Sequence, residues 1–224
     1  MCGRYYVDDG VEDALERIAG YREAVQAGDI VPSAAAPVMA AGGKDGRLTA
    51  GPMRWGYPVS FAGADDRTAG KLLINARAET VLTKRSFEKD VLYRRCIIPA
   101  AGFYEWNRSR EKVTFTAENG GVLFMAGIYR LDRDGKHFVI ITTAANDSMR
   151  PVHDRMPLIL KEQQLQDWAA DTDAARQMLR TVPPQLTRRQ EYEQLHFDFL
   201  QSSRGDLTPL SHHRTCRSAY GGSK

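Results

Sequence analysis

The stretch Val122–Thr143, with the sequence VLFMAGIYRLDRDGKHFVIITT, predicts a β-hairpin. Its two halves, Val122–Tyr129 and His137–Thr143, are rich in the β-branched and aromatic residues that favour strands. Asp134-Gly135 lies between them, and an Asp-Gly step between apolar runs is a strong signal for a tight turn. We therefore expect two neighbouring antiparallel strands in the core of the fold.

Further strands and a few short helices are predicted on both sides of this hairpin. The strand candidates are Leu48–Tyr57, Arg95–Trp106 as a strand and turn, and Val113–Thr116, while Ile30–Met39 is expected to be extended and Leu72–Ile74 is a short apolar run. The helix candidates are Val11–Ala27 capped by Asp8 or Asp9, Ser86–Tyr93 capped by Ser86, Glu162–Ala169, and Thr172–Leu179 capped by Asp171. Gly20 leaves open a division of the first helix into two. The pattern predicts a single α+β domain with a mainly antiparallel sheet core.

Length and composition limit the possible classes of protein. The chain has 224 residues, enough for one sizeable domain or two small ones, and we expect one domain spanning residues 1–200. Residues 201–224 lose periodicity and are rich in Ser, Arg, His and Gly, so they are expected to be a disordered tail. The net charge of +3 does not indicate nucleic-acid binding by bulk charge.

The sequence also indicates a cellular location. No run approaches the roughly 20 apolar residues of a membrane span, and no signal-peptide leader is visible. The cysteines Cys2, Cys96 and Cys216 show neither a pairing pattern nor metal-ligand spacing, which suggests a reducing cytoplasm. We expect a cytoplasmic protein with no metal and no cofactor.

Cys2 follows the initiator Met1, and this position has its own chemistry. Removal of Met1 would leave an α-amine and a thiol on adjacent carbons. Such a 1,2-aminothiol condenses with an aldehyde to an imine, which the thiol then closes to a five-membered thiazolidine. The α-amine titrates near ~7.7–8.0 and the thiol near ~8.5, so both suit neutral pH. A chance cysteine behind the start codon is the alternative.

Five short motifs stand in order along the chain. They are Met1-Cys2-Gly3-Arg4, Met53-Arg54-Trp55-Gly56, Asn75-Ala76-Arg77-Ala78-Glu79-Thr80, Gly102-Phe103-Tyr104-Glu105-Trp106 and His153-Asp154-Arg155-Met156-Pro157. Their order and spacing, from Cys2 to about Val182, resemble the SRAP family of SOS-response-associated peptidase-like proteins. Ala34 stands where members commonly carry Gln, and Ala101 where they carry Asp. The resemblance implies a barrel-like β core flanked by short helices.

The resemblance also implies an activity. Family members recognise abasic sites in single-stranded DNA and bond to them through the N-terminal cysteine, as part of the response to DNA damage. On the matching positions, Cys2 would be the nucleophile and Asn75 a hydrogen-bonding orienter. Glu105, among aromatic neighbours, would shuttle protons, and His153 would be a second acid/base group able to act near neutral pH.

DNA contacts are assigned in the same way. Arg4, Arg77 and Arg155 would bind the phosphates that flank the lesion, because the guanidinium fork donates two hydrogen bonds at once. Trp106 and Trp55 would stack on bases. The alternatives are solvated arginines and tryptophans that pack in the core or at its rim. Arg94 and Arg95 remain candidates for contacts with the DNA backbone only.

The sequence therefore predicts a monomeric, nucleoid-associated sensor that forms a thiazolidine crosslink with abasic DNA and shields it. Strand-breaking lyase activity and peptidase-like removal of its own Met1 are further possibilities. An N-terminal-nucleophile amidohydrolase also begins Met-Cys-Gly, but Arg4-Tyr5-Tyr6 follows here instead of an apolar strand. A non-covalent reader of modified single-stranded DNA is the other alternative, and its binding would survive Cys2→Ala.

Overall fold

The computed structural model describes residues 2–42, 45–59 and 71–190. All of them belong to the first of two units, Met1–Gln190 and Glu191–Lys224. The predicted tail at 201–224 and Cys216 lie outside the described residues. The domain boundary near residue 200 therefore stays a prediction.

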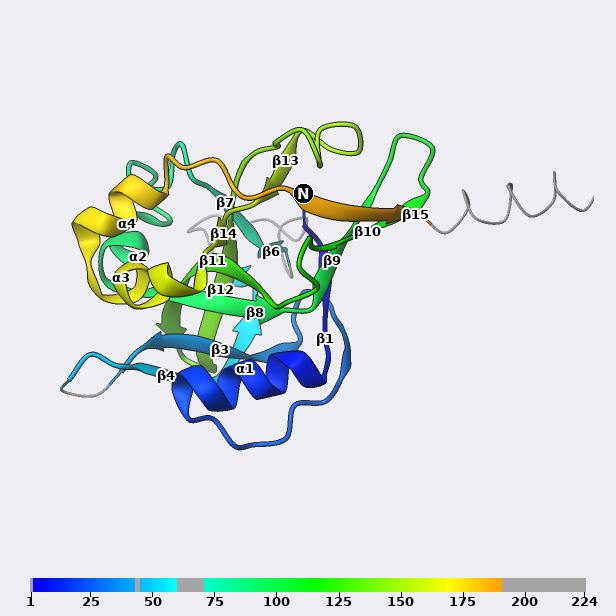
Figure 1. The fold of residues 1–224 in the computed structure, drawn as a ribbon. Helices are drawn as coiled ribbons and strands as arrows, with labels where there is room; N and C mark the ends of the chain where they lie inside the picture. The colour runs from blue at the N-terminus through cyan, green and yellow to red at the C-terminus, as the bar shows by residue number, and fades with distance from the viewer. Residues whose placement is uncertain (1, 43–44, 60–70, 191–224) are drawn as a thin grey trace, which may run out of the picture. The chain divides into compact units, whose positions relative to one another are not determined.

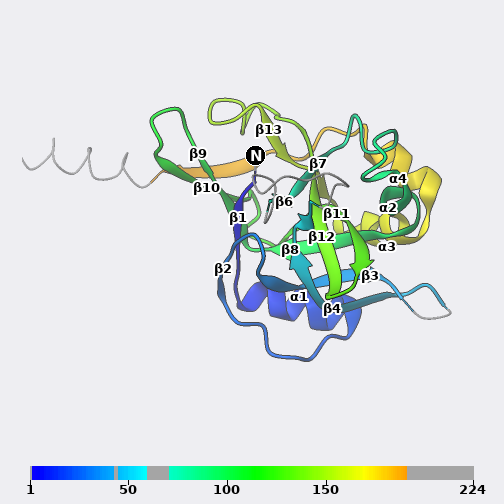
Figure 2. The same ribbon diagram turned by 180° about the vertical axis from the view of Figure 1, so that it is seen from behind.

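A closed barrel of five strands forms the centre of the fold (Figures 1 and 2). Its strands are β3 (Ala35–Ala41), β4 (Leu48–Trp55), β8 (Arg95–Ala100), β11 (Leu123–Asp132) and β12 (Gly135–Ala144). Four of the five pairings are antiparallel, and the ring closes through a parallel pairing of β12 with β4. Closure removes the exposed strand edges that an open sheet would leave. The predicted α+β class with a mainly antiparallel, barrel-like core is confirmed.

The predicted hairpin joins β11 to β12, with its turn one residue earlier than expected. Asp132 pairs with Gly135, so Arg133 and Asp134 make the turn. Gly135 has φ 126°, a backbone conformation that residues other than glycine rarely adopt. The glycine of the Asp-Gly step therefore resumes the strand instead of forming the turn itself.

A second sheet of five strands holds the N-terminal segment. Its order is β15-β10-β9-β1-β2, and its strands are β1 (Arg4–Val7), β2 (Gly28–Ile30), β9 (Gly102–Trp106), β10 (Lys112–Ala117) and β15 (Leu186–Gln190). Phe103 and Phe115 stack with ring centroids 5.2 Å apart on its inner face. β15 was not among the predicted strands.

Shorter strands complete the sheets. They are β5 (Tyr57–Pro58), β6 (Leu72–Leu73), β7 (Asn75–Arg77), β13 (Arg155–Pro157) and β14 (Ile159–Leu160). β7 pairs in parallel with β12, and β13 pairs with the end of the same strand. The arrangement places the Asn75 motif and the His153 motif along a single barrel strand.

In the described part of the chain, five helical segments surround the sheets: α1 (Asp9–Ala19), α2 (Glu88–Tyr93), η1 (Glu162–Gln164), α3 (Leu165–Ala170) and α4 (Thr172–Met178). The predicted continuation of the first helix to Ala27 is wrong, because Gly20 ends α1 in a left-handed conformation. Asp8 and Asp171 cap α1 and α4 as predicted. Ser86 does not cap α2, whose N-cap position is Phe87.

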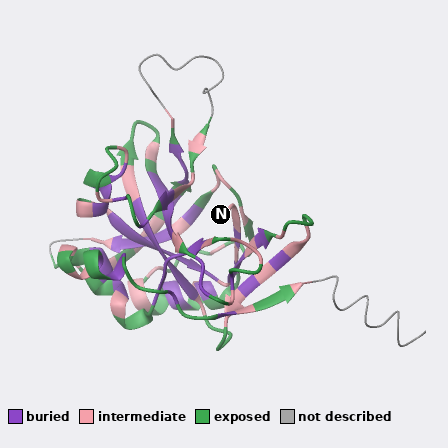
Figure 3. Ribbon diagram, turned by 90° about the horizontal axis from the view of Figure 1, so that it is seen from above, coloured by how far each residue is buried: buried purple, intermediate pink, exposed green. Residues whose placement is uncertain are grey.

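Buried residues concentrate on the crossing strands at the centre of the domain (Figure 3). Trp55, Phe138 and Trp168 are among the largest fully buried side chains. Trp168 Nε1 donates a hydrogen bond of 2.9 Å to the carbonyl oxygen of Cys96, which fixes α3 against β8.

Candidate active site at the N-terminal cysteine

Cys2 lies just before β1, and its side chain is fully buried. Its Sγ is 3.9 Å from the carbonyl oxygen of Arg4, which suits a weak S–H donor. Burial raises the pKa of the thiol well above its ordinary value, and the negative charge of Glu105 adds to that rise. The sulfur is therefore held as a neutral thiol beside a carboxylate.

Asn75 ties the Cys2 segment to the barrel. Its Nδ2 donates a hydrogen bond of 2.9 Å to the carbonyl oxygen of Cys2. Asn75 pairs with Ile140 through the parallel β7–β12 contact, so a rigid element sets its position. Among the residues that the structure describes, its buried Oδ1 has no hydrogen-bond partner. That oxygen is a buried acceptor on the same carboxamide that binds the Cys2 carbonyl oxygen.

Glu105 lies on β9 and is only 5% exposed. It pairs across the sheet with Val113, whose side chain is fully buried, so both residues face the interior. β1 pairs with β9, with Arg4 opposite Tyr104, so Cys2 and Glu105 lie at the same end of adjacent strands, and the charge of Glu105 adds to the raised pKa of the Cys2 thiol. Cys2, Asn75 and Glu105 thus come together from three separate parts of the sequence.

His153 is in the loop before β13, with its side chain 28% exposed. Its Nδ1 is 2.9 Å from the backbone nitrogen of Arg155 and also 2.9 Å from Oδ1 of Asp154. One nitrogen cannot serve both partners in the same protonation state. The neutral ring accepts from the Arg155 N–H, and a protonated Nδ1 donates to Asp154. The contacts therefore accommodate either form of the imidazole.

Arg155 and Arg77 lie together at the end of β12. Arg77 pairs with Thr142, and Arg155 Nη2 donates to the Thr142 carbonyl oxygen at 2.6 Å. Arg155 also forms a two-pronged ion pair with Glu79 at 2.6 and 2.9 Å. The pKa of Glu79 is lowered, first by this hydrogen bonding. Glu79 belongs to the Asn75 motif, but sequence reasoning gave it no role.

Arg4 and Trp106 lie next to each other at the edge of the site. The Arg4 guanidinium is 6.0 Å from the centroid of the Trp106 ring, and Trp106 is 40% exposed. Arg4 also lies 3.5 Å from Asp29. Both side chains are accessible to a ligand, as their predicted roles require.

The predicted role of Trp55 is wrong, because its side chain is fully buried and has no surface for a base. Its ring packs between Tyr5, 5.2 Å away, and Phe138, 6.2 Å away. Its Nε1 donates to the carbonyl oxygen of Ile74 at 3.0 Å, next to Asn75. Trp55 is a core residue that supports β7 from beneath.

Arg94 and Arg95 are likewise engaged within the fold. Arg95 is 4% exposed and donates to the carbonyl oxygens of Val91 and Trp168, at the ends of α2 and α3. Cations are favoured at helix C-termini, where carbonyl groups lack partners. Arg94 pairs with the buried Asp90. A DNA contact by Arg95 is therefore excluded by its burial.

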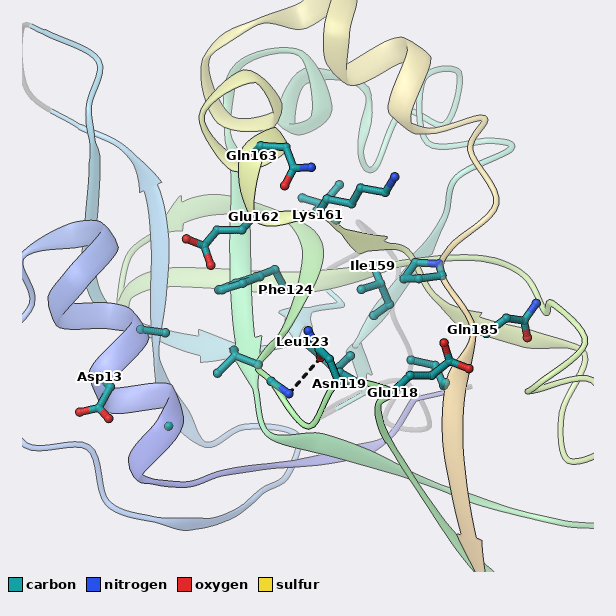
Figure 4. Close-up of a pocket in the computed structure, with 18 of the residues that line it drawn as sticks. Asp13, Glu118, Asn119, Leu123, Phe124, Ile159, Lys161, Glu162, Gln163 and Gln185 are labelled. Atoms are coloured by element: carbon teal, nitrogen blue, oxygen red, sulfur yellow. Dashed lines mark hydrogen bonds between the residues drawn. The ribbon is translucent and has the colours of Figure 1, made fainter.

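The hollow in Figure 4, with a volume of about 660 Å³, lies elsewhere. Apolar side chains such as Phe124 and Ile159 form its floor, and Asp13, Glu118 and Lys161 stand at its rim. None of the nine predicted site residues lines it. Within the described ranges, no three His, Cys, Asp or Glu side chains are grouped to hold a metal ion. The same ranges contain no helix that could cross a membrane.

The domain resembles known structures as a whole. A solved structure of a protein from Bordetella bronchiseptica has 25% sequence identity and a TM-score of 0.68, covering 84% of this chain and 99% of its own. One from Bacteroides thetaiotaomicron has 21% identity and the same TM-score, covering 84% of this chain and 91% of its own.

Sequence relatives carry a common description. The abasic site processing protein YoqW of Bacillus subtilis is 33% identical over 75% of this chain and 80% of the relative. The abasic site processing protein YedK of Escherichia coli is 30% identical over 75% of this chain and 79% of its own length. The abasic site processing protein HMCES of Rattus norvegicus is 29% identical over 52% of this chain and 44% of its own length.

The family model described as SOS response associated peptidase (SRAP) matches residues 1–196. The match contains the buried Cys2 together with Asn75, Glu105 and His153. The chain therefore belongs to the SRAP family.

Proposed function

We propose that this protein bonds covalently to abasic sites in single-stranded DNA through Cys2, once Met1 has been removed. One observation carries the proposal: Cys2 is enclosed at the start of the chain, held by Asn75 and beside Glu105. The printed names of the relatives support abasic sites as the substrate. Because the aldehyde of the abasic sugar would be consumed in the bond to Cys2, the bound protein would shield the lesion from other reactions.

The chemistry needs no external reagent. The α-amine adds to the ring-opened aldehyde of the abasic sugar to give a carbinolamine. Loss of one water gives the imine. The Cys2 sulfur then forms a bond to the imine carbon while the nitrogen takes up the thiol proton. The product is a thiazolidine, and its mass is the sum of protein and DNA less one water.

The candidate groups have side chains that suit these steps. Glu105 would transfer protons as the sugar ring opens and as the carbinolamine loses water; such help is worth typically ~10²–10⁴-fold in rate. Asn75 would hold the Cys2 carbonyl and offer its buried Oδ1 to the new α-amine. His153, whose contacts accommodate both protonation states, would act as a second acid or base at the sugar.

The order of bond formation follows from the state of the thiol. A thiol with a raised pKa is a weak nucleophile in its resting form, so the amine reacts first. The imine is also the species from which β-elimination would break the strand. Closure by sulfur consumes the imine, so crosslinking and lyase activity compete for one intermediate.

Three cations would hold the DNA on either side of the lesion. Arg4 stands beside Trp106, and Arg77 and Arg155 stand together at the end of β12. Trp106 would stack on a neighbouring base, a contact that tolerates any sequence and is worth roughly 1–3 kcal/mol.

The test is a denaturing gel of purified protein incubated with single-stranded DNA containing one abasic site. Mass spectrometry first confirms that Met1 is absent. We expect a heat-resistant shifted band that requires the lesion and disappears in Cys2→Ala. Cys96→Ala removes another buried free thiol away from the N-terminus and should retain the band.

Two outcomes would count against the proposal. A band that survives in Cys2→Ala assigns the bond to another residue. No band from protein that lacks Met1 excludes the covalent mechanism, and amide substrates would then be examined.

A further inference from the structure

The outer face of the β15-β10-β9-β1-β2 sheet carries aromatic and cationic side chains. Cross-strand partners point to the same side of an antiparallel sheet. The pairing aligns Arg4 with Tyr104, Tyr104 with Thr114, and Thr114 with Arg189. With the neighbouring positions, this outer face comprises Arg4, Tyr6, Tyr104, Trp106, Lys112 and Arg189.

Two tyrosines form the centre of the outer face. The rings of Tyr6 and Tyr104 stack with centroids 5.3 Å apart and 25° between their planes. Tyr6 lies across from Gly102, where an added Cβ would come within 2.7 Å of the Tyr6 ring. Glycine at this position therefore lets the Tyr6 ring lie close against the sheet. Both rings are half-buried, so part of their surface remains open to solvent.

Cations lie beside these rings. The Lys112 ammonium is 5.0 Å from the centroid of Tyr104, and the Arg4 guanidinium is 6.0 Å from that of Trp106. Burial and Asp8 raise the pKa of the Tyr6 hydroxyl, and the charge of Arg189 lowers it, so Arg189 also lies near the pair. Aromatic faces flanked by cations suit a ligand that alternates flat rings with negative charges.

The outer face continues directly from the candidate active site. Trp106 follows Glu105 on β9, with its side chain on the opposite side of the strand. Arg4 is two residues from Cys2. Figure 1 shows β1, β9, β10 and β15 beside one another, on the side away from α2, α3 and α4, and Figure 2 agrees. A nucleotide strand leaving Cys2 past Trp106 would therefore meet Tyr104 and Tyr6 next.

We propose that this outer face binds the single-stranded DNA that leads away from the abasic site, with bases on the tyrosines and phosphates on Lys112 and Arg189. The inference rests on the proposed function, since it extends the path of the same strand. Its charge suits the ligand: it carries three cations, and Asp29 lies at its β2 edge, bonded to the Tyr104 hydroxyl at 3.2 Å. Stacking without base-specific contacts predicts binding of any sequence.

The first experiment measures the affinity for lesion-free single-stranded DNA by fluorescence anisotropy. Tyr104→Leu should weaken binding about tenfold, whereas Tyr104→Phe, which keeps the ring, should bind like the wild type. Tyr93→Leu is the matched control, because Tyr93 is 76% exposed on another element. Thermal melting of each variant confirms that it is folded.

The second experiment measures how affinity depends on salt. Loss of one phosphate contact lowers the slope of log K against log salt by about 0.7 for a single strand. Lys112→Ala and Arg189→Ala should each show that reduction. Lys136→Ala is the matched control, since Lys136 lies 5.7 Å from the Tyr129 ring in an equivalent pair on β11 and β12.

The outcome separates this inference from the proposed function. Wild-type affinity and salt slope in Tyr104→Leu, Lys112→Ala and Arg189→Ala would overturn the inference. The proposed function would be unaffected, because the denaturing gel tests Cys2-dependent crosslinking independently. If the three variants show the expected losses of affinity and salt slope but the wild-type protein forms no crosslink, only the proposed function is overturned. A stable dimer that DNA does not dissociate would assign the outer face to a second copy of the chain, against the inference.

Discussion

The Asn75 carboxamide donates a hydrogen bond of 2.9 Å to the carbonyl oxygen of Cys2. The bond joins residues 73 positions apart and sets the reactive end of the chain against β7. Without it, the residues before β1 would have one connection fewer to the barrel. Position, more than the thiol itself, distinguishes Cys2 from Cys96, which is also buried.

Asn75→Ala is expected to slow crosslinking about tenfold or more, because it frees the Cys2 carbonyl and removes the acceptor next to the α-amine. A buried group left without its partner costs about 1–3 kcal/mol, so the free energy of unfolding should fall only modestly. Single-turnover crosslinking and urea unfolding measure the two effects. Asn119→Ala is the control, because it removes a surface amide whose oxygen accepts a hydrogen bond from the Gly121 backbone nitrogen. Equal rates in both variants would remove Asn75 from the mechanism.

Glu105→Gln should change two measurements of Cys2 in opposite directions. The carboxylate raises the pKa of the thiol, so the amide should increase the rate of thiol alkylation by iodoacetamide at mildly alkaline pH. Burial is the larger cause of the raised pKa and remains, so the increase should be a few-fold. Crosslinking should slow by about 10²-fold because proton transfer is lost. A parallel fall in both rates would indicate misfolding of the site instead.

Glu79→Gln should strengthen DNA binding. The Glu79 carboxylate occupies the same guanidinium fork of Arg155 that a phosphate would need. The Glu79 side chain is 49% exposed and that of Arg155 13%. With solvent screening on the Glu79 side, we assign the pair about 0.2–1 kcal/mol, which corresponds to a gain in affinity of up to about fivefold. Anisotropy with lesion-free DNA measures it, and Arg155→Ala should cancel the gain. Weaker binding by Glu79→Gln would mean that Glu79 orients Arg155 productively.

Stability should fall in alkali because of the buried thiols. Burial, and then the charge of Asp90, raises the pKa of Cys96 well above its ordinary 9.0, and the Cys2 thiol is also raised. The folded state therefore holds these protons more tightly than the unfolded state. Their contribution is complete below pH 9.0 and falls above it, by about 1.4 kcal/mol per pH unit for each thiol. Urea unfolding across this range should show a shallower decline in Cys96→Ala.

Substitutions at Trp55 and Trp106 should separate stability from DNA binding. Trp55→Phe removes buried volume and the hydrogen bond to Ile74, so it should lower the free energy of unfolding by about 1–3 kcal/mol. Trp106→Ala should leave stability nearly unchanged and weaken DNA binding about tenfold. Urea titration measures the free energy of unfolding of each variant, and anisotropy measures its affinity for DNA. Undiminished DNA binding by Trp106→Ala would remove it from the interface.

Much of the barrel could be predicted because its strands carry local signals. The hairpin of β11 and β12 was predicted from the composition of its strands and from the Asp-Gly step between them. Closure of the ring could not be predicted, since the parallel pairing of β12 with β4 joins segments about 80 residues apart. β15 was missed because Leu186–Gln190 contains two arginines, and only its pairing with β10 makes it a strand.

Errors at the site have identifiable physical causes. A stacking role for Trp55 ignored the alternation of β4, in which Met53 and Trp55 face inward and Arg54 outward. That period of two was visible in the sequence and would have placed Trp55 in the core. Arg95 was misjudged because burial of a charge depends on the helix carbonyls that satisfy it, and those come from α2 and α3. Such partners are set by tertiary packing.

The pairing of the N-terminal strand β1 with β9, which comes much later in the sequence, has a consequence for biosynthesis. Cys2 is translated early and β1 can pair with β2 soon afterwards, but β1 can pair with β9 only once β9 has been translated, and β7 with β12 only once β12 has been. A nascent chain therefore exposes its thiol without Asn75, Glu105 or His153 in place. Under the proposed function, the Cys2 thiol of an incomplete chain would react like that of any exposed cysteine. Its reactivity toward abasic sites would develop only after enough of the chain has been translated for the domain to fold around it.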